Sequence, residues 1–134
     1  MANHFKPTAS QQEVLRDNSK NLLVSASAGS GKTATIIQKI LNLIVKNKID
    51  LQELLVITFT ESASLEMKIR LKEKLFEEVG KDSELIKQID KLPTSDISTI
   101  HGFCSKCIRK YFYELDLNPN FLVLDGNNAN FLKG

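Results

Sequence analysis

The feature that most constrains this chain is a glycine-rich segment, residues 26–33, which joins an apolar run to a helix pattern. The apolar run Leu22 to Val24 is typical of a buried parallel strand. From Lys32 onward, apolar residues recur at the spacing of one helix face, and they are Ile36, Ile37, Ile40, Leu41 and Ile44. A strand, a glycine-rich turn and a helix in this order predict an α/β fold with a phosphate-binding loop.

The types of residue in this loop explain how it would bind phosphate. Glycines at 29 and 31 let backbone N–H groups point inward, and the following helix presents its positive N-terminal end. Lys32 would reach the β- and γ-phosphates, and the Thr33 hydroxyl would ligate Mg²⁺. The residues predicted to bind the nucleotide here are Ala26, Ser27, Ala28, Gly29, Ser30, Gly31, Lys32, Thr33 and Ala34. Alternatively, the segment is only a turn between strand and helix, with Lys32 solvated.

The loop departs from the general motif at one position, and it does not by itself identify the class of protein. Ala26 occupies a position where the general motif has glycine, so the site must accommodate a methyl group. Kinases, GTPases, pumps and helicases share such loops and differ elsewhere. A small kinase would complete its lid within one domain, and nothing after Gly102 resembles an arginine-rich lid.

The rest of the chain repeats the strand and helix pattern. Before and after the glycine loop we expect a short helix over 8–17, a strand over 54–57, and a helix from Thr60 to Gly80 whose apolar face is Met67, Leu71, Leu75 and Val79. A short charged helix over 81–92, ended by Pro93, and a β-like stretch over 97–100 follow. The last expected elements are a helix whose apolar stripe is Cys104, Cys107, Ile108, Tyr111 and Leu115, and a strand over 121–124. The mixed charges of residues 66–78 indicate the solvated side of a helix.

Composition sets limits on location and partners. A length of 134 residues suits one domain, and a net charge of +2 gives no strong nucleic-acid signal by itself. No apolar run approaches the roughly 20 residues that span a bilayer, so we expect a cytoplasmic protein with no membrane partner. Cys104 and Cys107 with His101 are too few ligands for a structural zinc site, so both cysteines are predicted to pack in the core.

Four segments of the chain carry a resemblance to a known family. They are Thr8 to Gln12, residues 25–33, Val56 to Thr60 and Ser98 to Cys104. In this order they resemble the opening motifs of superfamily 1 DNA helicases of the UvrD and Rep type. The form of residues 25–33 and 99–104, together with residues 115–121 and 124–125, is most similar to the AddA and RecB helicase-nuclease subunits. The resemblance covers nearly the whole chain.

The resemblance implies a fold and an activity. The fold would be the first RecA-like motor domain of a P-loop NTPase, a parallel sheet flanked by helices, with residues 1–134 forming its N-terminal part. The activity would be an ATP- and Mg²⁺-dependent helicase that moves on single-stranded DNA in double-strand-break repair. It would have an exonuclease elsewhere in the parent protein and an AddB- or RecC-like partner, and it would also engage duplex DNA. The alternatives are a solitary repair helicase and a nucleotide-gated DNA-binding module without catalysis.

The same resemblance implies what this chain lacks. No acidic pair of the kind that holds magnesium and orients the attacking water follows the second motif block, and no second motor domain or arginine finger is recognisable. We therefore expect residues 1–134 alone to bind Mg-ATP weakly without turning it over. The edge of the sheet is expected to be exposed and prone to self-association.

Gln11 matches the glutamine that the family uses near adenine. An amide offers both a donor and an acceptor to a purine edge. Thr8 and Gln11 also form a capping-box pattern, and both roles are compatible. Ala34 stands where many relatives have arginine, so a contact near the nucleotide is expected to be missing.

The two later motifs imply contacts with DNA. Thr58, Phe59 and Thr60 match a segment that follows single-stranded DNA, where Phe59 would stack on a base and Thr60 would bond phosphate. Alternatively Phe59 lies in the core and Thr60 only caps the next helix. His101 matches another DNA-facing segment, and its alternative role is to cap its own helix.

Overall fold

The computed structural model describes residues 6–80, 82–118, 120–121 and 123. Its helices are α1 (Ala9–Arg16), α2 (Lys32–Val45), α3 (Glu61–Val79), α4 (Leu85–Lys91) and α5 (Ile100–Lys110), its strands are β1 (Leu55–Thr58) and β2 (Asp96–Thr99), and its short 3-10 helices are η1 (Leu51–Glu53) and η2 (Leu92–Thr94). The prediction of an α/β chain is confirmed in this form, as a small parallel sheet with helices.

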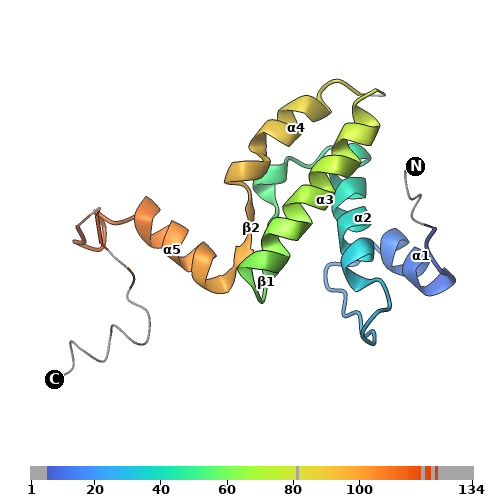
Figure 1. The fold of residues 1–134 in the computed structure, drawn as a ribbon, viewed down its shortest axis with the longest axis horizontal. Coiled ribbons are helices and arrows are strands. Elements are labelled where there is room, and N and C mark those ends of the chain that lie inside the picture. Colours follow the sequence, from blue (N-terminus) through green and yellow to red (C-terminus); the bar gives the residue numbers. More distant parts are fainter. Residues whose placement is uncertain (1–5, 81, 119, 122, 124–134) are drawn as a thin grey trace.

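The sheet consists of β1 and β2, which pair in parallel from Leu55 with Asp96 to Thr58 with Thr99. Parallel strands need a crossover connection, and α3 and α4 provide it (Figure 1). Val56 packs against the core, whereas Leu55 and Ile57 on the opposite face of β1 are exposed. Among the described residues, α3 covers one face of the sheet, and the face that carries Leu55 and Ile57 is exposed.

The core lies between α2, α3, α4 and β2. Its buried apolar residues are Ile37, Ile40, Leu41, Ile44, Leu51, Met67, Leu71, Leu75, Leu85, Ile89, Leu92 and Ile97. The apolar faces predicted for α2 and α3 are thus confirmed, except that Ile36 is exposed and Val79 only partly buried. The side of α3 that carries mixed charges is mainly exposed and includes the Glu66–Arg70 ion pair.

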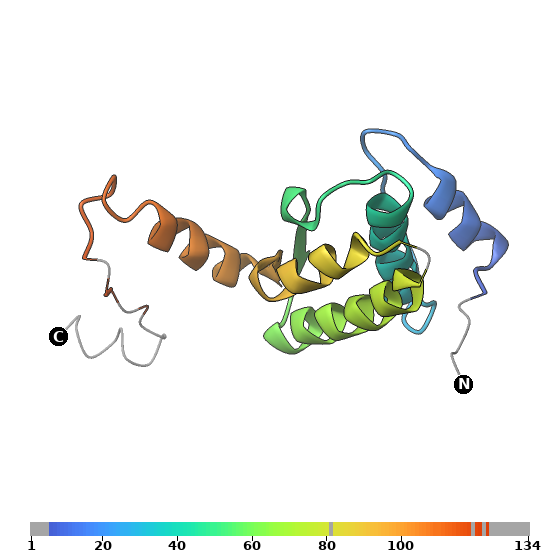
Figure 2. The same ribbon diagram turned by 90° about the horizontal axis from the view of Figure 1, so that it is seen from above.

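The two outer helices lie at opposite ends of the molecule, as Figures 1 and 2 both show. α1 packs on α2, while α5 starts at the end of β2 and extends away from the core. Among the described residues, no helix has both the length and the apolar character needed to cross a membrane.

The strand predicted at Leu22 to Val24 is wrong. The segment has no regular structure, and the Leu23 side chain is 96% exposed. An extended segment becomes a strand only when a neighbour supplies ladder hydrogen bonds. The one sheet of the described residues contains β1 and β2 alone, so the apolar run has no strand beside it.

The predictions for the C-terminal third need two corrections. In α5, Cys104 is exposed and Cys107 is only half-buried, and neither belongs to the core cluster. The predicted core packing of both cysteines is therefore wrong. α5 ends at Lys110, before Tyr111 and Leu115, both of which are exposed. A helix gains most of its stability from packing an apolar face, and these residues have little to pack against. Of the possible strand over 121–124, residues 122 and 124 lie outside the described residues, and Phe121 and Val123 are not in a strand.

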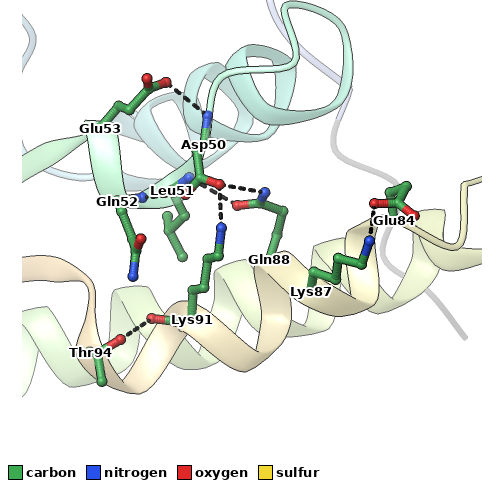
Figure 3. Close-up of polar contacts among 9 residues, drawn as sticks. All are labelled: Asp50, Leu51, Gln52, Glu53, Glu84, Lys87, Gln88, Lys91 and Thr94. Atoms are coloured by element: carbon green, nitrogen blue, oxygen red, sulfur yellow. Dashed lines mark hydrogen bonds and ion pairs between the residues drawn. The ribbon is translucent and has the colours of Figure 1, made fainter.

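The charged helix predicted over 81–92 is shorter than expected, since α4 covers only Leu85–Lys91. A polar cluster ties it to η1 (Figure 3). The Asp50 carboxylate accepts hydrogen bonds from Lys91, from the Gln88 amide at 3.2 Å and from the Gln52 N–H at 2.9 Å. The Lys91 bond first, and then the Gln52 bond, lower the pKa of the Asp50 carboxyl to about 2. The loop before β1 is thereby fastened to the helix before β2.

Candidate nucleotide and DNA site

The glycine loop, residues 26–33, has the backbone geometry that its glycines were predicted to allow. Gly29 has φ +75° and Gly31 has φ +79°, both in the left-handed region that side chains with a Cβ avoid. Gly31 is the N-cap of α2 and offers no side chain to its first turn. The N–H groups at the start of α2 therefore point toward the loop without a side-chain cap, an arrangement suited to an anion.

Lys32 is folded back onto the loop. Its ammonium donates to the carbonyl oxygens of Ala26 at 2.5 Å and Ser27 at 3.1 Å. Lys32 is exposed to solvent, and its ammonium is directed into the loop. Phosphate oxygens would compete with these carbonyls for the same ammonium, since a charged acceptor makes the stronger bond.

The next residues of α2 differ in how accessible they are. Thr33 is exposed, and its hydroxyl makes no hydrogen bond among the described residues, so it is accessible to a cation at the loop. Ala34 is half-buried, and its methyl group cannot make the polar contact expected of an arginine. Thr35 is buried, and its hydroxyl donates a hydrogen bond to the Gly31 carbonyl at 3.0 Å, which stabilises the start of the helix.

Gln11 performs its capping role and also contacts the loop. The backbone N–H of Thr8 donates to Gln11 Oε1 at 2.9 Å, completing a capping box at α1. Gln11 Nε2 donates to the Ser30 carbonyl at 2.9 Å. Since an amide has two N–H donors and two acceptor lone pairs, one of each stays available to a purine edge.

A cavity of about 600 Å³ lies between α1, the segment before the loop and α2. Val14, Leu22, Val24 and Ile36 give it apolar walls, and Gln11 and Lys32 are among its polar lining residues. This volume is within the range of small-molecule sites. The apolar run that was predicted to be a strand therefore lines a cavity.

Lys39 contributes to this region, although it was not singled out from the sequence. From α2 its ammonium donates to the carbonyls of Val14 at 3.2 Å, Leu15 at 3.3 Å and Asp17. A cation at a helix C-terminus is favourable, and here it fastens α1 beside the loop. The signal was a lysine within the apolar stripe of α2, between Ile36 and Ile40.

The end of β1 carries the first pair of candidate DNA contacts. Phe59 is fully exposed, which rules out its alternative place in the core. Thr60 is the N-cap of α3 and accepts the Ala63 N–H at 3.1 Å, as predicted for its capping role. Thr58 is half-buried and donates its hydroxyl to the Thr60 carbonyl at 3.0 Å.

The end of β2 carries His101. The N-cap of α5 is Thr99, whose hydroxyl accepts the Gly102 N–H at 3.0 Å, so the alternative that His101 caps this helix is wrong. His101 is exposed in the first turn of α5. Because Thr58 pairs with Thr99, the ends of both strands lie at one edge of the sheet. α2 and α3 also start on that side of the molecule, toward the bottom of Figure 1.

The class of the protein follows from its family. The UvrD/REP helicase N-terminal domain family matches residues 7–133, nearly the whole chain. The chain belongs to that family.

Its individual relatives narrow the comparison. The chain is similar to AddA, a subunit of the ATP-dependent helicase/nuclease, from Ligilactobacillus salivarius (strain UCC118), with 45% identity over 130 residues, 92% of this chain and 10% of that protein. The AddA proteins of Clostridium novyi (strain NT) and Syntrophomonas wolfei subsp. wolfei are 42% and 38% identical, over 96% and 94% of this chain. The chain thus spans about a tenth of the length of these relatives.

Proposed function

We propose that this chain provides the ATP phosphate loop and part of the single-stranded DNA track of an ATP-dependent DNA helicase. Its proposed fold is the N-terminal part of the first RecA-like motor domain of a P-loop NTPase, with residues 1–134 in one domain. The observation that carries the proposal is the pair of left-handed glycines, Gly29 and Gly31, at the uncapped start of α2. Membership of the UvrD/REP family supports it.

The proposed nucleotide site uses the loop residues in distinct roles. Lys32 transfers its hydrogen bonds from the loop carbonyls to the β- and γ-phosphates, and the N–H groups of residues 29–34 surround them. Thr33 would supply a hydroxyl ligand for Mg²⁺, and the ion would offset the negative charge of the phosphates. Gln11 reads the adenine edge with the donor and acceptor that its capping box leaves available.

The proposed DNA track lies along the strand ends. Phe59 is placed in solvent, where a base can stack on it regardless of sequence. Thr58, Thr60 and His101 provide polar contacts to phosphate and fix the register of the strand. In this proposal, ATP-driven closure against a second motor domain moves the strand past these contacts.

The relatives suggest the larger assembly in which the chain works. Because they are named as subunits of an ATP-dependent helicase/nuclease, we infer a cytoplasmic helicase-nuclease for double-strand-break repair. It would have an AddB- or RecC-like partner, and its exonuclease would lie outside residues 1–134. A solitary repair helicase is the alternative. Nuclease assays on the full-length protein distinguish the two.

The test is the ATPase activity of the full-length protein with and without single-stranded DNA. We expect strong stimulation by DNA and a loss of about a hundredfold or more in Lys32→Ala, since the variant removes a preorganised charge at the phosphates. Lys46→Ala, at the exposed end of α2, is the control and should retain activity. Hydrolysis that ignores DNA or survives Lys32→Ala would contradict the proposal, and nucleotide binding without hydrolysis would favour a nucleotide-gated binding module.

A further inference from the structure

A hydrogen bond joins the starts of α3 and α5 across the end of the sheet. The Thr99 hydroxyl donates to Glu61 Oε1 at 2.5 Å and accepts the Gly102 N–H at 3.0 Å. Because the hydroxyl has a single proton, accepting from Gly102 leaves that proton for the carboxylate. We call this contact the Glu61–Thr99 bridge.

The residues around the bridge shield it from water and leave space for it. Thr99 is 7% exposed, so its hydroxyl has little access to water and depends on these two partners. A Cβ at Gly102 would lie 3.3 Å from Thr99 Oγ1 and 3.4 Å from Glu61 Oε1. Because Gly102 has no Cβ, the Glu61 carboxylate and the Thr99 hydroxyl can approach each other without a close contact at position 102.

The position of the bridge suggests what it does. The β1–β2 ladder ends at the pair Thr58 and Thr99, and the candidate DNA contacts Phe59 and His101 lie just beyond it. Past that pair, the bridge is the hydrogen bond that joins the two strand-end segments in the described part of the chain. Without it, only the β1–β2 ladder and the packing of α3 on β2 would fix one segment relative to the other.

We propose that Glu61 is a positioning residue for the DNA track: through Thr99 it fixes the segment at residues 58–60 relative to the start of α5. This inference rests on the proposed function. Glu61 does not itself bind DNA, since its carboxylate repels phosphate. Its charge and its hydrogen bond therefore have opposite effects on DNA affinity, and suitable variants separate them.

The test measures the single-stranded DNA concentration that gives half-maximal ATPase stimulation in the full-length protein. Glu61→Ala removes the bridge, and we expect this concentration to rise about five- to tenfold, the net size of one ordinary intramolecular hydrogen bond. Glu61→Gln keeps an acceptor for Thr99 and removes the charge, so it should need no more DNA than the native protein. The KM for ATP and the rate at saturating DNA should change in neither variant, because the glycine loop is untouched.

Glu73→Ala is the matched control. It removes one negative charge from the exposed side of the same helix and should leave DNA stimulation unchanged. Thr60 remains the N-cap of α3 in all three variants, which protects the fold. If Glu61→Ala binds DNA as well as or better than the native protein, or if Glu61→Gln is as weak as Glu61→Ala, the positioning role is wrong. A native protein that DNA does not stimulate would overturn the proposed function as well as this inference.

Discussion

Gly29 and Gly31 adopt nearly the same backbone conformation but have different surroundings. A Cβ at Gly31 would lie 3.0 Å from Gln11 Nε2, whereas nothing lies within 4 Å of one at Gly29. A residue with a Cβ would therefore have a strained backbone at either position, but its Cβ would crowd a neighbour only at position 31. The pair separates the conformational role of a loop glycine from its role in admitting a neighbour.

We expect Gly31→Ala to destabilise the chain more than Gly29→Ala. Each variant bears the left-handed strain of about 1–2 kcal/mol, and only Gly31→Ala also crowds Gln11 Nε2, which donates to the Ser30 carbonyl. Urea unfolding of both variants at neutral pH measures the difference. Equal losses of unfolding free energy would show that the Gln11 contact adds nothing to stability.

At this scale the sequence was most informative where the backbone alone decides. An unusual backbone at Gly29 and Gly31 and the capping roles of Thr8 and Thr60 follow from local chemistry and were predicted, while the left-handed φ values themselves come from the structure. The Lys32 contacts to the loop carbonyls, the three carbonyls at Lys39 and the Glu61–Thr99 bridge were not. These contacts depend on how distant segments meet, which no local pattern specifies.

Helix α1 shows how an element with no buried residue is held in place. It is too short to be stable alone, since isolated helices under about 12–15 residues are marginal in water. Gln11 holds one end to the loop, and the Lys39 ammonium holds the carbonyls at the other. Its position beside the loop therefore depends on these polar contacts together with its packing on α2.

We expect Lys39→Met to loosen α1. Methionine keeps the apolar stem and loses the ammonium, so amide hydrogen exchange across Ala9–Arg16 should accelerate about tenfold, while exchange in the core of α2 stays slow. Lys46→Met, at the exposed end of α2, should leave α1 unchanged. Unaltered exchange in α1 of Lys39→Met would show that this lysine does not hold the helix.

Elements were predictable where the pattern was long and periodic. α2 and α3 follow their apolar faces, and β1 lies within one residue of its predicted place. The apolar run Leu22 to Val24 has strand character but no paired neighbour, and the stripe of α5 has nothing to bury it. A strand needs a neighbouring strand to pair with, and an apolar helix face needs a surface to pack against. The hydrophobicity of a segment does not show whether the rest of the chain provides either one.

At the scale of the whole molecule, acidic side chains fasten the connections between elements. The Lys91 bond lowers the pKa of Asp50 to about 2, the Lys48 bond lowers the pKa of Asp82, and the Ser19 bonds lower the pKa of Asp17. A carboxyl with a lower pKa in the folded state stabilises the fold above its unfolded pKa, and that stability is lost as the pH falls. Acid should therefore weaken all three connections.

We expect the urea midpoint of the chain to fall as the pH drops from about 4, the ordinary Asp value, toward the Asp50 value of about 2. Asp50→Asn should be less stable than the native chain at neutral pH, and the difference should shrink across this window. Asp90→Asn, an exposed position on α4, is the control. A constant difference between Asp50→Asn and the native chain at every pH would contradict a role for the Asp50 charge.

The order in which the sheet is made on the ribosome has a further consequence. β1 ends at Thr58, but its partner begins only at Asp96, after α3 and α4 have been synthesised. At roughly 5–20 residues per second, β1 waits a few seconds with its backbone edge unpaired. During that interval α3 can already pack on α2, so a helical layer precedes the sheet. Slower translation between the two strands lengthens the time in which a chaperone, or another nascent chain, can bind β1 first.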